Sequence, residues 1–211
     1  MKKLLTIAIA TLGVSVAAHA GFVVEPSIGY QGATGSTAMQ YKQGSTQYNY
    51  TQSSIPVGLR VAYQTAMGFF YGVQADYFTG GTMTYQNATY SNDTFTRTIV
   101  SAELGYEGAR GFRVFGGYDV MNNIANTPGT TNPNAADFTA VANSGFNVGL
   151  GWRFHNHIAI NAQYDMANTT PTAITPKSTG TSGSMAAGGY SNWTDGGIVQ
   201  VNVSFPFGSS K

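Results

Sequence analysis

The chain has 211 residues, no cysteine and nearly balanced charge, with ten Lys or Arg residues against nine Asp or Glu residues. Without cysteine neither a disulfide framework nor a lipoprotein anchor can form, and the lack of a basic cluster argues against a nucleic-acid partner. Only 9% of the residues are charged, whereas a soluble surface usually carries about 25–35%. Part of the surface is therefore expected to face something other than water.

The first twenty residues have the layout of a secretory signal peptide. Two lysines precede an apolar run that begins at Leu4, and the run ends in an Ala-His-Ala cleavage motif at residues 18–20. The run is too short for a transmembrane helix and lacks a charged stop-transfer segment. We therefore expect residues 1–20 to be a cleaved signal peptide and residues 21–211 to form one domain.

The remaining sequence contains segments of about ten residues in which apolar and polar side chains alternate, the pattern of strands with two different faces. In chain order, the predicted strands are residues 22–31, 56–64, 69–78, 97–106, 112–119, 146–154, 158–165 and 198–207. Three short turns, at 65–68, 107–111 and 155–157, alternate with four longer polar segments, at 32–54, 80–94, 121–143 and 168–195. This rhythm predicts an all-β, eight-stranded antiparallel up-and-down barrel.

The apolar faces of these strands are predicted to point outward, into lipid. The opposite faces carry many glycines and few charges, which suits the crowded inside of a narrow barrel better than a soluble exterior. From Phe69 to Tyr77 a strand rises about 21 Å along the membrane normal at a ~40° tilt, close to the apolar band of about 25 Å in such barrels. Aromatic residues mark both ends of this band and are predicted to lie at the membrane interfaces: Phe22, Tyr30, Tyr63, Phe69, Tyr77, Tyr106, Phe112, Tyr118, Trp152, Phe154, Tyr164 and Phe207.

Two prolines conflict with the strand pattern, because proline cannot donate a ladder hydrogen bond. Pro206 lies near the end of the last predicted strand and is expected at the periplasmic rim. Pro26 lies in the middle of the first predicted strand. There we expect a local bulge, where the first and last strands meet.

The inward faces carry a set of charged residues that is predicted to form a network in the lumen: Glu25, Arg60, Asp76, Arg97, Glu103, Arg113, Asp119, Arg153 and Asp165. Buried charges must be paired and hydrogen-bonded. The set can form a polar pathway for solutes or a salt-bridged filling, and the small lumen of eight strands favours the filling. Glu25 with Arg60, and Glu103 with Arg113, are the predicted pairs. His155 and His157 lie in a short turn without a carboxylate or cysteine nearby in sequence, so no catalytic, metal or cofactor site is predicted.

The exported eight-strand pattern and the aromatic-rich last strand, Val199-Gln200-Val201-Asn202-Val203-Ser204-Phe205, resemble the small outer-membrane barrels of bacteria. These include outer membrane protein X, the barrel domain of outer membrane protein A and the opacity proteins. The resemblance covers residues 21–211 and rests on periodicity rather than on a motif. It implies a place in the bacterial outer membrane, contact with lipid and lipopolysaccharide, and insertion by the outer-membrane assembly machinery. Because four residues follow Phe207 here, the assembly signal is expected at Phe205 or Phe207.

Three functions fit this architecture. The first is a surface-interaction barrel, with an adhesive or structural role in the envelope, whose polar loops, rich in Tyr, Gln, Asn, Ser and Thr, contact a host or surface ligand. The second is a narrow channel for small or hydrophobic solutes. The third, a lipid-modifying enzyme, is disfavoured, because enzymes of similar architecture keep a catalytic histidine near the outer leaflet and neither His155 nor His157 falls there. We therefore expect a protein that is not an enzyme.

Overall fold

The computed structural model describes residues 21–33, 40–43, 46–85, 93–127, 136–155, 157–176, 190–194 and 197–208. The expected signal peptide lies outside these residues. Within them, no helix has the length and apolar character that crossing a membrane would require.

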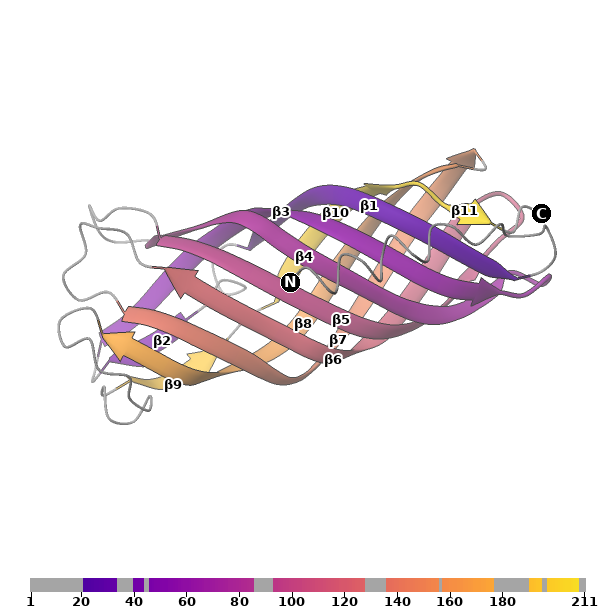
Figure 1. Ribbon diagram of the computed structural model, residues 1–211. Coiled ribbons are helices and arrows are strands. Elements are labelled where there is room, and N and C mark those ends of the chain that lie inside the picture. The colour runs from indigo at the N-terminus through magenta and orange to yellow at the C-terminus, as the bar shows by residue number, and fades with distance from the viewer. Residues whose placement is uncertain are drawn as a thin grey trace, which may run out of the picture.

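Eight strands form the wall of a barrel: β1 (Phe22–Ala33), β3 (Thr46–Gln64), β4 (Phe69–Tyr85), β5 (Asp93–Glu107), β6 (Phe112–Thr127), β7 (Ala136–His155), β8 (Ile158–Pro176) and β10 (Ile198–Ser204). Each strand pairs antiparallel with the next, and β1 pairs with both β3 and β10, which closes the sheet (Figure 1). The predicted eight-stranded antiparallel barrel is confirmed. Three short strands extend it: β2 (Gln40–Gln43), β9 (Tyr190–Thr194) and β11 (Phe207–Gly208).

The strands are strongly staggered around the barrel. A line of paired residues leaves β1 at Gln31, crosses to Gln200 on β10 and continues through the other strands to Gln64 on β3. There the Gln64 amide donates to the Gly21 carbonyl at 2.7 Å. The line that started at Gln31 therefore comes back to the N-terminal strand at Gly21, which is ten residues earlier in the sequence. Such a stagger tilts the strands and sets a narrow bore, which side chains can fill.

The side chains alternate between the two faces as the sequence predicts. On β10 buried and exposed residues alternate without interruption. On β7, Leu150 points outward and is 58% exposed, whereas its neighbours Gly149 and Gly151 face the lumen. The outer face carries a continuous set of exposed large apolar residues, and such a surface is stable in lipid rather than in water.

Two of the short turns depend on glycine. Gly68 and Gly111 close the β3–β4 and β5–β6 turns with φ of 92° and 85°, a left-handed conformation that residues with a Cβ avoid. Each glycine amide donates to a carbonyl three residues earlier, Gly68 to Thr65 and Gly111 to Gly108, at 2.9 Å. These tight connections all lie at one end of the barrel, and the extended strands lie at the other (Figure 1).

At the opposite end the strands are longer than predicted. The structure starts β3 at Thr46 and β7 at Ala136, and it continues β4 to Tyr85, β6 to Thr127 and β8 to Pro176. The prediction that these segments are loops is therefore wrong over much of their length. The apolar alternation becomes irregular in these segments, but backbone pairing does not require it, and Thr and Tyr favour strands.

The expected bulge at Pro26 is also wrong. The pairing of β1 with the last strand keeps the same register on both sides of Pro26, from β10 to β11. The amide of Phe205 donates to the Pro26 carbonyl at 2.9 Å. In an antiparallel strand the N–H and C=O of a residue point to the same neighbouring strand. The side of Pro26 that lacks an N–H donor therefore faces the last strand, at the break beside Pro206 between β10 and β11. The interruption thus falls on the last strand instead.

Candidate functional site

The structure places the nine predicted lumen residues on the inward face. Eight of them are at most 5% exposed, namely Glu25, Arg60, Asp76, Arg97, Glu103, Arg113, Asp119 and Asp165. Arg153, near the short-turn end, has a side chain that is 12% exposed. Their burial in a closed barrel means that each charge depends on neighbouring side chains rather than on bulk water.

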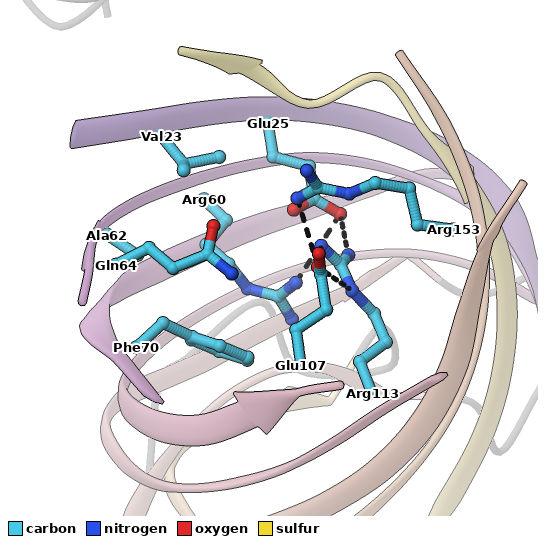
Figure 2. Close-up of a pocket in the computed structure, with 9 residues that line it drawn as sticks. All are labelled: Val23, Glu25, Arg60, Ala62, Gln64, Phe70, Glu107, Arg113 and Arg153. Atoms are coloured by element: carbon cyan, nitrogen blue, oxygen red, sulfur yellow. Dashed lines mark hydrogen bonds and ion pairs between the residues drawn. The ribbon is translucent and has the colours of Figure 1, made fainter. Parts of the chain in front are cut away.

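Glu25 is the centre of the network near the short-turn end. Its Oε1 accepts hydrogen bonds from Arg113 Nη1 and Ser204 Oγ, both at 2.5 Å. Arg60 Nη1 lies 3.5 Å from the same oxygen. The predicted ion pair of Glu25 with Arg60 is therefore present, but Arg113 makes the closer contact (Figure 2).

The predicted pair of Glu103 with Arg113 is replaced by two others. Glu103 Oε2 accepts from Arg60 Nε at 2.7 Å, and Arg113 bonds to Glu107 as well as to Glu25. The register explains the change: Arg113 on β6 lies directly opposite Glu107 on β5, whereas Glu103 lies opposite Gly117. The prediction considered which strands are adjacent but not which residues lie opposite each other on them.

Glu107 is a charged residue of the lumen network that the sequence interpretation missed, because it was assigned to a short turn. Its Oε2 accepts from Arg113 Nη2 at 2.7 Å and from Arg153 Nη2 at 3.0 Å (Figure 2). Glu107 continues the set of odd-numbered inward residues of β5, which includes Arg97 and Glu103. This period of two was the signal that could have found it.

Arg60 is also held by aromatic rings. Its guanidinium carbon lies 4.6 Å from the ring centre of Phe115 and 5.7 Å from that of Phe70, distances at which a cation is attracted to the ring face. Glycine makes room for these rings, since a Cβ at Gly149 would lie 2.2 Å from the Phe115 ring. Contacts of the Arg60 cation with aromatic rings therefore fill part of the lumen, in addition to the ion pairs.

Three carboxylates farther along the lumen are held by uncharged donors. Asp76 accepts from Gln74 at 2.6 Å, Asp119 from Ser101 at 2.7 Å and Asp165 from Gln163 at 2.9 Å. In the described part of the lumen, six carboxyl groups thus face four guanidinium groups. The described residues contain no group of three or more His, Cys, Asp or Glu side chains that could hold a metal ion.

The remaining space in the lumen is small. A small cavity at the short-turn end is lined on one side by Val23, Ala62 and Phe70 and on the other by the charged residues Glu25, Glu107, Arg113 and Arg153 (Figure 2). A second small cavity lies among polar side chains. Glu25 and Arg60 line both cavities, so their ion pair separates the two spaces.

The twelve predicted interface aromatics lie on the outer face. Ten are exposed, and Tyr63 and Tyr164 are half-buried. Several pack against a ring on the next strand, such as Phe69 with Tyr106 at 5.2 Å and Phe112 with Trp152 at 6.2 Å between ring centres. These pairs gather near the short-turn ends of the strands, as expected of a girdle at a membrane interface.

No protein-family model and no curated protein matches this chain. Among solved structures, it is similar to Ail, the attachment invasion locus protein of Yersinia pestis, with a TM-score of 0.50 and 12% identity over 90% of this chain and 100% of Ail. It is also similar to the outer membrane protein OprG from Pseudomonas aeruginosa, with a TM-score of 0.54 and 12% identity over 92% of this chain and 99% of OprG. At such identities the shared property is the fold. With its closed antiparallel sheet, filled lumen and apolar outer surface, the chain has the fold of the small eight-stranded outer-membrane β-barrels.

Proposed function

We propose that this protein is a surface-interaction barrel: a closed anchor in the outer membrane whose strands present a polar sheet to a partner outside the cell. The observation that carries the proposal is the pairing of β7 with β8, which continues well past the apolar belt. From Tyr164 on the belt, β8 runs twelve residues farther and is still paired at Pro176 with Ala136. Twelve residues rise about 30 Å above the belt at a ~40° tilt.

The extension has the composition of an exposed binding element. Residues 166–176 contain no charged side chain and four threonines. A backbone paired in strands loses less entropy on binding than a flexible loop does. The extension therefore offers a preformed surface.

The second edge of the extension has no paired strand among the described residues. β8 pairs with β10 only up to Asp165 and Ile198, and farther along β9 lies near β8 without a described ladder between the two strands. β9 pairs with β2 instead. An exposed edge binds an extended peptide through main-chain hydrogen bonds. We infer that the partner is a protein that adds a segment to this edge, between Ala167 and Pro171.

The filled lumen supports an anchor over the alternative of a channel, because its inward side chains are buried and bonded to one another. Ail, an attachment invasion locus protein, provides a precedent for attachment on the same fold. The role proposed for this chain rests on its β7–β8 extension and not on the similarity to Ail.

The test is to shorten the extension by deleting residues 137–144 and 168–175 together. Bacteria that display the shortened protein are expected to lose binding to host cells or extracellular matrix, whereas barrel insertion, measured by heat-modified gel migration, stays unchanged. A matched variant replaces residues 167–176 with Gly and Ser in equal number and is expected to lose binding too, because chain length alone does not provide an edge. Retention of binding by both variants would refute the proposal.

A further inference from the structure

The described part of the lumen contains two apolar clusters. One, formed by Ala62, Phe70 and Phe115, lies against the Arg60 guanidinium in the ion-pair network, and the other lies farther from the short turns. Phe78, Ile99 and Ile198 are 0%, 2% and 0% exposed and pack as one cluster. They come from β4, β5 and β10. Around the ring of eight strands, β10 lies opposite β5 and three strands from β4. Contact of Ile198 with this pair therefore crosses the bore.

We propose that these three residues, the apolar plug, are the main barrier to ion passage through the barrel. An apolar constriction offers no hydrogen bonds to a hydrated ion, so an ion must lose its water there without replacement. The ion-pair network nearer the short-turn end is different, because the two small cavities beside it are lined by charged and polar side chains. Such side chains can replace part of the water that an ion loses.

Two carboxyl groups lie directly beside the plug. Asp76 on β4 is the cross-strand neighbour of Ile99, and Asp165 on β8 is the cross-strand neighbour of Ile198. β4 and β8 lie opposite each other in the ring, so the carboxylates approach the plug from two walls. Opening the plug admits water to these carboxyl groups, which favours their ionised forms, so the passage is expected to select cations over anions.

The experiment uses the complete protein purified from membranes and inserted into planar bilayers in KCl. The unmodified protein is expected to be silent. The variant Phe78→Ala/Ile99→Ala/Ile198→Ala is expected to show stepwise conductance with a reversal potential of cation sign under a salt gradient. A control, Tyr77→Ala/Val100→Ala/Val199→Ala, changes the sequence neighbours that face outward and is expected to stay silent.

Two further variants keep the test decisive. If the triple alanine variant does not form a heat-modifiable barrel, Phe78→Gln/Ile99→Asn/Ile198→Asn retains more of the volume and is expected to conduct for the same reason. Asp76→Asn/Asp165→Asn in the conducting background is expected to move the reversal potential toward zero.

A folded plug variant as silent as the unmodified protein would overturn the proposal. So would conductance in Glu25→Gln/Arg60→Met, which leaves the plug intact and breaks the ion-pair network. Preference for anions would overturn the role of the carboxylates. The result is independent of the surface-interaction function, because the plug variants keep the β7–β8 extension and are expected to bind as the unmodified protein does.

Discussion

Arg113 Nη1 lies 2.5 Å from Glu25 Oε1, and this contact ties together two strands that are opposite each other in the barrel, β6 and β1. Arg113 also bonds to Glu107 on the adjacent strand. One guanidinium thus bonds to two buried carboxyl groups from different walls. Because the bore holds no bulk water, the stability of each of these buried charges depends on its ion-pair partners.

Arg113→Ala should therefore destabilise the barrel strongly. Removing one partner leaves buried charge without compensation, which costs about 3–5 kcal/mol. Urea unfolding in lipid vesicles, followed by gel migration, measures the change. Arg110→Ala, on the exposed β5–β6 turn, is the control and should alter the free energy of unfolding by less than about 0.5 kcal/mol. Equal effects of the two substitutions would contradict the assigned network.

Leu150→Arg tests the orientation of the strands. Leu150 lies on the outer face near the middle of the apolar belt, so an arginine there should cost about 2–4 kcal/mol. Phe154→Arg is a matched control, because Phe154 lies on the same strand and face with the same 58% exposure. It lies at the belt's end, where the cost falls to about 0–1 kcal/mol. Similar unfolding free energies for both variants would argue against a lipid-facing belt.

Gly149→Ala tests how tightly the lumen is packed. The added Cβ would lie 2.2 Å from the Phe115 ring, and forcing the ring aside should cost about 1–3 kcal/mol. Adding Phe115→Leu to Gly149→Ala should recover part of this loss. Gly32→Ala, where the nearest atom would be 3.6 Å away, should be nearly neutral. A neutral Gly149→Ala would indicate a looser lumen than described.

Tyr118 and Phe146 test the contribution of ring pairs on the outer face. Their ring centres are 5.3 Å apart with the planes at 69°, a T-shaped arrangement between cross-strand neighbours. A double-mutant cycle with alanine at both positions should give a coupling of about 0.5–1.5 kcal/mol. Purely additive losses would mean that each ring interacts with lipid alone.

The eight strands and their two faces could be predicted from the sequence because side-chain alternation along a strand is a local property. Each of the first seven predicted segments lies within one observed strand, and the last continues across the break at Pro206. Strand ends beyond the belt, such as Pro176 on β8, could not be predicted in this way. Pairing there depends on a neighbouring backbone and leaves no regular side-chain alternation in the sequence.

The pairing of charges and the position of the apolar plug were decided by the tertiary structure. Alternation places Glu25, Glu103 and Arg113 on the inner face, but closure and stagger of the barrel determine which of them meet. The contact of Arg113 with Glu25, like that of Ile198 with the opposite wall, joins residues far apart in sequence. Such contacts follow from the ring as a whole, because strand number and stagger together set which side chains share a level of the bore.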